Sequence, residues 1–232
     1  MKCLILASGF GTRLYPLTKT QAKALLPYKG KPMINHVVDK VPEDIEILVN
    51  INKKFEQDFY KWQNEIDRDI TLCVEPVYDE TQMLGAISSL NYWIKEKHIT
   101  EDLMIIGSDN YFEFSLNEFI AFYNKSNIVV AIYDIGDKNK VTEYGVVRLE
   151  NTRIVEFEEK PAAPKSSLVA TACWIIPPRI FPLIAEFCSQ GKRDNLGTFI
   201  AYLVEKEEVD AFVFDELWLD IGSIEVYYST KD

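Results

Sequence analysis

Five short apolar segments, separated by helix-like segments, recur over the first 133 residues and limit the folds open to this chain more than any other feature. The first of them, KCLILA, is apolar almost throughout; the five lie at 2–7, 45–51, 70–75, 103–107 and 128–133. Nearly continuous apolar runs of this length are typical of strands covered on both faces. Because these strands alternate with helices, we expect βαβ units and an α/β fold with a mixed, mainly parallel sheet flanked by helices.

Helix signals fill the gaps between these segments. Asn52 suits the cap of a helix that reaches Ile66, and Pro32 suits the first turn of a helix that reaches Lys40. In the segment 81–97, four apolar residues recur at helical spacing, which indicates a helix packed against the sheet. These residues are Met83, Ile87, Leu90 and Ile94.

The pattern changes after about residue 140, where strand-like segments follow one another with mostly short turns between them. The elements expected there are strands at 144–149, 153–159 and 167–176, a helix at 180–189, a strand pair in 209–223 and a short helix at 223–228. No repeat or Gly/Ser-rich linker interrupts the chain. We therefore expect a single domain, 1–232, with a nucleotide-sized half at about 1–112 and a mixed half at about 113–232 on the same sheet.

The acidic composition argues against one class of function. The chain carries 36 acidic and 25 basic residues, which gives a net charge of −11 at pH 7. A general nucleic-acid binder needs a basic face to displace counterions, so we expect no nucleic-acid partner. No apolar run approaches the roughly 20 residues that span a bilayer, and the N-terminus lacks the features of a signal peptide. We therefore expect no membrane partner and a soluble, cytoplasmic protein.

The cysteines and histidines offer few routes to catalysis. Four cysteines stand alone in apolar surroundings without CxxC spacing, which predicts free thiols in the core; they are Cys3, Cys73, Cys173 and Cys188. The two histidines, His36 and His98, are expected on the surface or at helix ends. A hydrolase built on a Ser-His or Cys-His pair is therefore disfavoured.

A glycine-containing loop, ASGFGTRLYPLT, follows the first predicted strand. It lacks the third glycine of a dinucleotide-binding fingerprint, and no GK[ST] follows it, so neither standard glycine motif is present. Gly9 and Gly11 nevertheless precede Thr12 and Arg13, and Lys23 lies close behind them. Two cations beside exposed backbone amides suit a triphosphate, so the loop is predicted to bind phosphate groups.

Two carboxylates stand where predicted strands give way to loops. Asp109 follows the apolar run at 103–107, and Asp220 follows a short apolar run before a glycine. Ligands in open α/β sheets bind beyond the carboxyl ends of the strands. Because Mg²⁺ prefers one or two carboxylates together with phosphates and water, Asp109 and Asp220 are candidates to share a Mg²⁺ ion.

These motifs resemble, in order, those of the sugar-1-phosphate nucleotidyltransferases, the family that includes glucose-1-phosphate thymidylyltransferases, uridylyltransferases and mannose guanylyltransferases. The segment ASGFGTRLYPLTKTQAKALLPYKGKPMI is similar to the signature GxGTRLxPxTxxxPKxLLP. Four shorter motifs follow it: SDN at 108–110, YGVV at 144–147, EEKP at 158–161 and WLDIG at 218–222. The resemblance implies a Rossmann-like fold of the nucleotide-diphospho-sugar transferase type, an EC 2.7.7 activity and Mg²⁺ as the cofactor.

The resemblance also implies a role for each matched residue. It implies a nucleotide site made of Ala7, Gly9, Gly11, Thr12 and Arg13, with Lys23 on the phosphates, and a Mg²⁺ site made of Asp109 and Asp220. It implies a sugar-phosphate site made of Gly145, Glu159, Lys160 and Thr171, with Glu159 on the sugar and Lys160 on its phosphate. Arg13, Lys23 and Lys160 would be the catalytic cations. The first half of the domain would bind the nucleotide and the second half the sugar phosphate.

This chemistry fits the residue content of the chain. The attacking group is a sugar phosphate, which is already largely a dianion at neutral pH, so no general base is required. Catalysis then consists of aligning the attack on the α-phosphorus in line with the departing pyrophosphate and of neutralising charge. A protein without a well-placed histidine or nucleophilic serine can carry out such a transfer.

Departures from the family pattern bear on substrate choice. Ala22 stands where a proline is usual, and Ala172 stands where a glycine is common in the sugar pocket. Glu75 begins an EP pair where thymidylyl and uridylyl enzymes commonly have QP. If Glu75 faces the base, its acceptor-only carboxylate suits the amino groups of cytosine or guanine. If Gln82 or Gly85 reads the base instead, dTTP or UTP with a hexose 1-phosphate is the default.

Two other interpretations stay open. In the first, CTP or GTP is the donor and the acceptor is phosphocholine, an alditol phosphate or another sugar phosphate. A choline group would need an aromatic cage, which Trp174, Tyr144 and Tyr202 could supply, whereas Glu159 in EEKP favours a sugar. A non-catalytic nucleotide-sugar-binding subunit is the third interpretation, but it would be expected to lose a metal aspartate or a catalytic cation. Little sequence follows WLDIG, so we expect a short form without regulatory C-terminal helices or a β-helix. The sequence leaves a homo-oligomer open.

Overall fold

The computed structural model describes residues 1–191 and 195–232, which fold into two compact units. The first unit comprises Met1–Leu84, Ile105–Glu113 and Leu217–Asp232, and the second comprises Gly85–Met104 and Phe114–Glu216. Each unit therefore draws on segments that are distant in the sequence. The division into a nucleotide half and a sugar-phosphate half near residue 112 stays a prediction.

The first unit is built on parallel strands. Their order is β5-β4-β1-β6, and the β1–β4 and β4–β5 pairs are parallel. The strands are β1 (Lys2–Leu6), β4 (Glu46–Asn52), β5 (Ile70–Glu75) and β6 (Leu103–Gly107), of which residues 105–107 belong to this unit. All four were predicted to within one residue at each end, because their apolar runs are covered on both faces. The predicted α/β fold class is confirmed.

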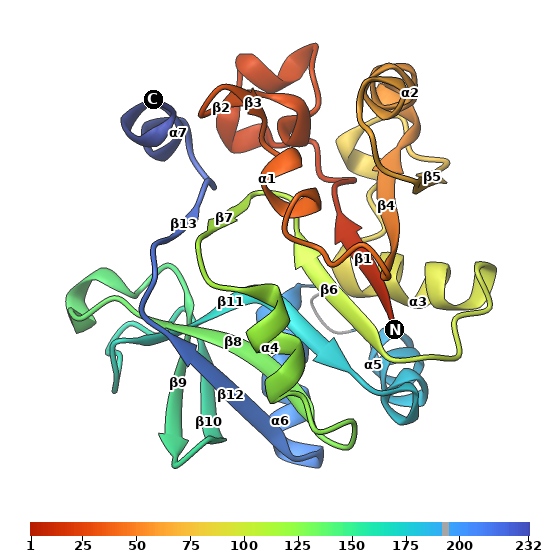
Figure 1. The fold of residues 1–232 in the computed structure, drawn as a ribbon. Coiled ribbons are helices and arrows are strands. Elements are labelled where there is room, and N and C mark those ends of the chain that lie inside the picture. The colour runs from red at the N-terminus through yellow and green to blue at the C-terminus, as the bar shows by residue number, and fades with distance from the viewer. Residues whose placement is uncertain (192–194) are drawn as a thin grey trace. The chain divides into compact units, whose positions relative to one another are not determined.

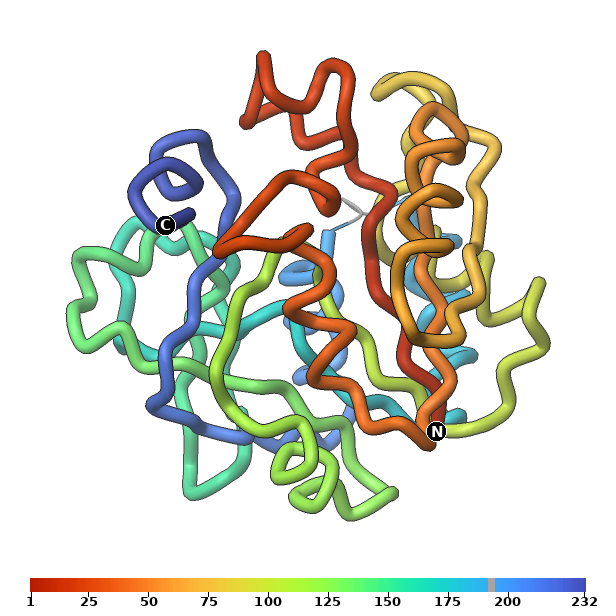
Figure 2. The backbone as a smooth tube through the Cα atoms, turned by 45° about the horizontal axis from the view of Figure 1, so that its top comes forward, coloured from red at the N-terminus to blue at the C-terminus, as the bar shows by residue number. Residues whose placement is uncertain are grey.

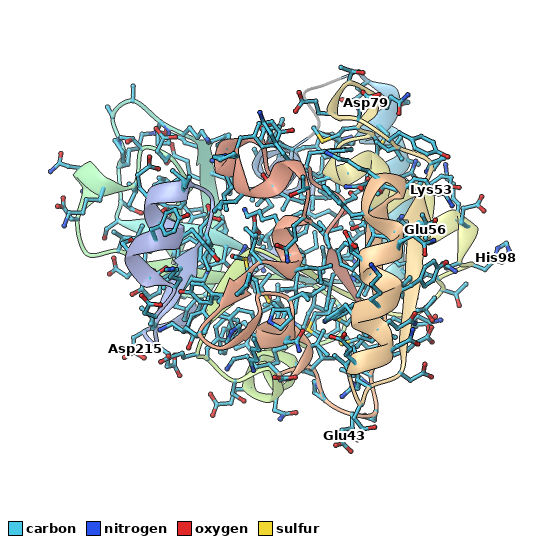
Figure 3. The ribbon with its side chains drawn as sticks, turned by 90° about the horizontal axis from the view of Figure 1, so that it is seen from above. Glu43, Lys53, Glu56, Asp79, His98 and Asp215 are labelled. Carbon is cyan, nitrogen blue, oxygen red and sulfur yellow. The ribbon has the colours of Figure 1, made fainter. Side chains whose placement is uncertain are left out.

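Helix α2 (Glu56–Glu65) lies beside β4 and β5 in the first unit (Figure 1) and buries Phe59 and Trp62. Asn52 caps the segment as predicted, since its Oδ1 accepts from the Phe55 N–H at 3.1 Å. The capped turn is a 3₁₀ turn that precedes α2. Figure 3 labels Lys53 and Glu56 there, where they form an ion pair with an N···O distance of 2.7 Å.

The predicted helix at 32–40 is wrong in its start and length. Pro32 ends a hairpin made of β2 (Pro27–Tyr28) and β3 (Lys31–Pro32), and α1 (Asn35–Val38) is a single turn. Lys29 and Gly30 have φ values of 45° and 82°. Two consecutive residues with positive φ form the two-residue turn that matches the twist of a tight hairpin. The hairpin turn therefore outweighs the proline signal for a helix start.

The C-terminal segment belongs to the first unit. Strand β13 (Trp218–Asp220) pairs antiparallel with β7 (Asn110–Phe112), and α7 (Ile224–Thr230) follows it. Figure 2 shows α7 in blue beside the red β2–β3 hairpin, where the Lys29 N–H donates to the Lys231 carbonyl at 2.8 Å. An apolar cluster joins these segments; its buried members are Leu14, Leu26, Tyr28, Met33, Ile221 and Tyr227.

The second unit has a mixed sheet in the order β11-β8-β12-β10-β9, and Val169 of β11 also pairs with Val146 of β9. The strands therefore close a ring of hydrogen-bonded neighbours. Its members are β8 (Ile128–Asp134), β9 (Gly145–Glu150), β10 (Arg153–Glu159), β11 (Leu168–Ile176) and β12 (Val209–Phe214). The expected pairing of two strands within 209–223 is wrong, because β12 pairs with β8 and β10 whereas β13 pairs with β7.

Four α-helices of the second unit are α3 (Ala86–Glu96), α4 (Leu116–Phe122), α5 (Phe181–Ser189) and α6 (Leu196–Lys206). Helix α3 packs against α5, and α6 packs against β10. Ile87, Leu90 and Ile94 are buried as predicted, but Met83 precedes α3 and is 50% exposed. The expectation that Met83 belongs to the packed stripe is therefore wrong.

The cysteines behave as expected: Cys3, Cys73 and Cys173 are buried free thiols, and Cys188 is half-buried. Burial raises the pKa of the Cys3 thiol, so it stays protonated. Among the helices that the structure describes, none is long and apolar enough to cross a bilayer.

His36 is half-buried, not a surface residue. Its ring lies 5.6 Å from the Tyr28 ring and 5.2 Å from the Tyr111 ring, centroid to centroid. Its Nε2 is 2.8 Å from the Tyr28 carbonyl oxygen. Since a carbonyl only accepts, Nε2 carries the proton in this contact. Burial, together with Lys31 and Lys29, lowers the pKa of His36 below its ordinary 6.5.

We predict that His36 makes the protein less stable as the pH falls below 6.5. Below this pH the unfolded chain binds the proton more readily than the native protein, so the free energy of unfolding decreases toward the lowered native pKa. Urea unfolding at pH 7.5 and 5.5 should show a smaller decrease in His36→Gln than in the wild type. The control is His98→Asn at the exposed His98, which Figure 3 shows pointing into solvent. An equal decrease in His36→Gln and the wild type would contradict this.

Candidate functional site

A cavity of about 250 Å³ in the first unit is lined by the predicted nucleotide loop. Seven predicted site residues line it: Ala7, Gly9, Gly11, Thr12, Arg13, Lys23 and Asp109. They come from the end of β1, from the loop after it and from the end of β6. The carboxyl ends of neighbouring strands thus meet at one cavity, as in other open α/β sheets.

Lys23 and Asp109 form an ion pair on the cavity wall. The Lys23 Nζ donates to Asp109 Oδ2 at 2.7 Å, and the Asn110 Nδ2 donates to Oδ1 at 3.0 Å. Burial by itself raises the pKa of Asp109, but the Lys23 ammonium and the Asn110 amide outweigh it and hold the pKa below the ordinary value. Asp109 is therefore a carboxylate, and Lys23 is a cation fixed by a partner.

Asp220 lies on the strand next to Asp109. In the β7–β13 pair, Asp220 is opposite Asn110, and the Ile221 N–H donates to the Asp109 carbonyl at 3.0 Å. The Trp218 Nε1 donates to the Asn110 Oδ1 at 2.8 Å, and both residues are buried. These bonds fix the backbones of both aspartates relative to each other, although Asp220 does not line the cavity.

Arg13 and Asp220 both approach Gly222. A Cβ added to Gly222 would lie 3.3 Å from the Asp220 Oδ2 and 3.4 Å from both terminal nitrogens of Arg13. The guanidinium of the loop therefore lies near the carboxylate of the C-terminal segment. Arg13 is exposed, so its side chain is available to an anion.

Gly11 adopts a conformation that other residues rarely adopt. Its φ is 61°, and an added Cβ would lie 3.1 Å from both the Lys23 Cβ and the Thr18 Cγ2. The Thr18 hydroxyl donates to the Gly11 carbonyl at 2.7 Å. Gly9, by contrast, has free space around it and no positive φ. The structure therefore requires glycine at position 11, whereas at position 9 it does not.

A buried network supports the start of the loop. The Asn50 Oδ1 accepts from the Ala7 N–H at 2.9 Å, and the Asn50 Nδ2 donates to Ser8 Oγ and to Glu75 Oε1. Glu75 is 2% exposed and does not line the cavity. Its carboxylate therefore orients Asn50, and through it the backbone at Ala7.

The other two candidates for reading the base differ in their surroundings. Gln82 lies in an exposed 3₁₀ turn of the first unit, and its Oε1 accepts from the Tyr78 N–H at 2.9 Å. Gly85 precedes α3 with a φ of 94° and belongs to the second unit. Neither lines the cavity, whereas Met83 does.

The predicted sugar-phosphate residues gather on β9, β10 and β11 of the second unit. Gly145 is directly opposite Glu159 in the β9–β10 pair, and the Lys160 N–H donates to the Tyr144 carbonyl at 3.0 Å. Thr171 is on the adjacent β11, which pairs with β9 at Val169. The structure therefore brings these four residues of distant sequence motifs to one edge of the ring of strands.

Two of these residues have a clear local reason for their identity or conformation. An added Cβ on Gly145 would lie 2.3 Å from the Phe157 ring, so the close approach of this ring requires glycine. Lys160 has a φ of 49°, a conformation that costs free energy for a residue other than glycine and is often found at functional sites. The Lys160 Nζ is 3.6 Å from the Glu143 carboxylate.

Thr171 is buried, and its hydroxyl donates to the Ala131 carbonyl at 2.9 Å. The proton of this hydroxyl is therefore committed to the backbone of β8. A ligand would find only the oxygen lone pairs of Thr171.

Asp109 and Asp220 fit Mg²⁺ better than a metal that needs many protein ligands. In the described part of the chain, no group of three or more His, Cys, Asp or Glu side chains is arranged to hold a metal ion. Asp109, directly before β7, and Asp220, on the paired strand β13, match the ligand set that Mg²⁺ uses together with phosphates and water. The ion-paired Lys23 would then neutralise the phosphates beside it.

Comparison with known proteins identifies the family. A family model described as nucleotidyl transferase matches residues 2–232. The chain belongs to the nucleotidyl transferase family. The resemblance inferred from the five ordered motifs is therefore confirmed, and the match covers both compact units.

Two curated relatives match nearly the whole of this chain. The chain is 28% identical over 228 residues to the bifunctional protein GlmU of Methanocaldococcus jannaschii, which covers 96% of this chain and 51% of the relative. It is 27% identical over 234 residues to the UTP–glucose-1-phosphate uridylyltransferase AglF of Haloferax volcanii, which covers 96% and 91%. The chain thus spans about half the length of the first of these relatives.

A solved structure from Bacillus anthracis, named as a candidate glucose-1-phosphate thymidylyltransferase in complex with sucrose, has a similar fold. The TM-score is 0.86 at 26% identity, and the match covers 100% of this chain and 94% of the other. Likeness over the whole chain supports the assignment to the nucleotidyl transferase family.

Five further residues that the sequence did not single out for the site line the cavity, namely Leu6, Phe10, Ala24, Met83 and Ser108. Met83 was hidden by a helical periodicity that it shares with α3, although Gly85 was a sequence signal that the helix begins later. Leu6, Phe10, Ala24 and Ser108 each adjoin a predicted residue, and the last three lie within the quoted motifs, but the motifs assign no role to them.

We predict that Gly11→Ala destabilises the protein whereas Gly9→Ala does not. Alanine at position 11 must adopt a left-handed conformation, which costs about 1–2 kcal/mol, and must also displace Lys23 or Thr18. Alanine at position 9 meets no atom within 4 Å. Urea unfolding without ligand measures both variants. Equal stability of Gly11→Ala and Gly9→Ala would contradict the need for glycine at position 11.

Proposed function

We propose that this chain transfers a nucleotidyl group from a nucleoside triphosphate to a sugar 1-phosphate, which yields a nucleotide sugar and pyrophosphate. The observation that carries the proposal is the cavity of the first unit, where Arg13, Lys23 and Asp109 line one wall beside the glycine loop. Fixed cations and backbone amides bind phosphates, and a carboxylate beside them suits Mg²⁺.

The triphosphate lies in this cavity with its phosphates at Lys23 and Arg13. Lys23 is held by Asp109 on the cavity wall, so its ammonium is already in place for a phosphate. The main-chain amides of Gly9, Gly11 and Thr12 orient the phosphates. Bound Mg²⁺, held by Asp109 and Asp220, would withdraw charge from the phosphates and so favour departure of pyrophosphate.

The acceptor is held by the second unit. Glu159 accepts hydrogen bonds from sugar hydroxyls, and Lys160 binds the sugar phosphate. Because the phosphate is already an anion, the residues of this chain only need to orient it for in-line attack on the α-phosphorus. The exchange of Glu143 for a phosphate at Lys160 is favourable, because a dianion attracts the ammonium more strongly than one exposed carboxylate does.

Phosphocholine is a weaker candidate than a sugar phosphate. An aromatic cage must present open ring faces to a quaternary ammonium group. Trp174 is 1% exposed and Tyr202 is 5% exposed, and both rings pack against Phe199. Two of the three predicted cage residues therefore belong to the core of the second unit.

The base is a pyrimidine with a carbonyl at C4, as in UTP or dTTP. The buried Glu75 uses Oε1 to orient Asn50, which supports a role behind the loop in preference to base reading. CTP or GTP is the alternative donor if the second oxygen of Glu75 reaches an amino group of the base. The relatives named above include a uridylyltransferase, which favours UTP.

We predict Mg²⁺-dependent release of pyrophosphate by the purified protein with UTP or dTTP and a hexose 1-phosphate. The assay pairs ATP, CTP, GTP, UTP and dTTP with a panel of sugar 1-phosphates, an alditol phosphate and phosphocholine, and mass spectrometry identifies the product. Preference for CTP or GTP would revive the base-reading role of Glu75. Release with phosphocholine alone would replace the acceptor, and no release by folded protein would contradict the proposed function.

We predict that Asp109→Asn lowers kcat at least about a hundredfold, because loss of a metal carboxylate removes several kcal/mol of charge stabilisation in the transition state. The matched control is Asp39→Asn, which breaks the exposed ion pair with Lys31 outside the cavity. Circular dichroism checks that both variants are folded. Full turnover by Asp109→Asn would refute the metal role of Asp109.

A further inference from the structure

The carboxylate of Glu159 lies directly against Gly197 of α6. A Cβ added to Gly197 would lie 1.8 Å from the Glu159 Oε2, 2.5 Å from its Cδ and 3.1 Å from its Oε1. The first two distances are far shorter than the contact of about 3.5 Å at which non-bonded heavy atoms attract one another. The space that a side chain would occupy at position 197 is therefore filled by the carboxyl group of Glu159.

The backbone at position 197 does not itself require glycine. The φ of Gly197 is not in the left-handed region, and the three nearest atoms to an added Cβ all belong to Glu159. Gly197 is the second residue of α6, and glycine in a helix is less favourable than alanine. The glycine therefore lowers helix stability, and its local benefit is room for one carboxylate.

The position of this carboxylate is favourable electrostatically. Helix α6 is 11 residues long, and the Asn195 Oδ1 caps it by accepting from the Thr198 N–H at 2.7 Å. The first turn of a helix carries a partial positive charge that attracts an anion. The Glu159 carboxylate, at the end of β10, thus lies at the positive end of a helix that packs against the same strand.

We propose that Gly197 is a positioning residue that lets the first turn of α6 hold the Glu159 carboxylate in place as an acceptor for sugar hydroxyls. The proposal rests on the proposed function, because it takes Glu159 as the sugar contact. A carboxylate fixed before the substrate arrives loses little conformational entropy on binding, so its hydrogen bonds contribute more to affinity. The residue at position 197 thereby changes the affinity for a hydroxyl-bearing acceptor, although it does not contact the acceptor.

The test is Gly197→Ala, which fills the place of the carboxylate with a methyl group. The Glu159 carboxylate is at the flexible end of an exposed side chain, so it can move away from the methyl group with little loss of stability. The expected result is a KM for the sugar 1-phosphate raised about tenfold or more, as for loss of a hydrogen bond to a charged group. The KM for the triphosphate should stay the same, and the thermal unfolding midpoint should not fall. Thr198→Ala, at the next position of the same turn, is the matched control.

A double-mutant cycle separates positioning from a purely structural effect. In a Glu159→Ala background the methyl group of alanine at position 197 has room, so Gly197→Ala should have no further effect on the KM for the sugar 1-phosphate. Additive effects of the two substitutions, or an unchanged KM in Gly197→Ala, would overturn the proposal. Failure of the wild type with every acceptor would instead contradict the proposed function.

Discussion

The ion pair between Lys23 and Asp109 is the interaction on which the candidate site of the first unit depends. It joins the loop after β1 to the end of β6, two segments 86 residues apart, with an N···O distance of 2.7 Å. Removal of either partner would leave a partly buried charge without compensation. Under the proposed function, Lys23 would bind the phosphates and Asp109 would hold Mg²⁺. Each group of the pair would then exchange its present partner for a ligand of the same sign of charge as that partner.

Residues around this pair form hydrogen bonds that orient the groups at the cavity. Asn50 fixes Ala7, Glu75 fixes Asn50, and Trp218 fixes Asn110 beside Asp109. In the second unit, packing of the Phe157 ring requires Gly145, and the carboxylate of Glu159 requires the space at Gly197. Both units thus hold polar groups in place through neighbouring side chains. Preorganisation of this kind is what a reaction without a general base demands.

Much of the fold follows from apolar patterning, and the exceptions have physical causes. The bounds of strand β5 follow from the sequence because Asp69 precedes its apolar segment and Pro76 follows it. The hairpin turn at Lys29 and Gly30 outweighed the helix signal of Pro32. Pairing of β13 with β7 depends on residues about 108 positions apart, as in the Trp218–Asn110 hydrogen bond, which no local pattern reveals. The loop glycines and the aspartates at strand ends were accessible to sequence reasoning, whereas the approach of Gly197 to Glu159 was not.

The most direct test of the account is the affinity of the protein for the Mg²⁺ complex of its preferred triphosphate, measured by calorimetry for the wild type and Lys23→Met. If Lys23 binds the phosphates, its loss raises the Kd at least about tenfold, the effect of one charged hydrogen bond. The control is Lys29→Met, because the Lys29 ammonium lies over the Tyr28 and Tyr111 rings. This variant should bind like the wild type. Equal affinity of folded Lys23→Met and the wild type would contradict the central claim that the Lys23–Asp109 pair forms the triphosphate site.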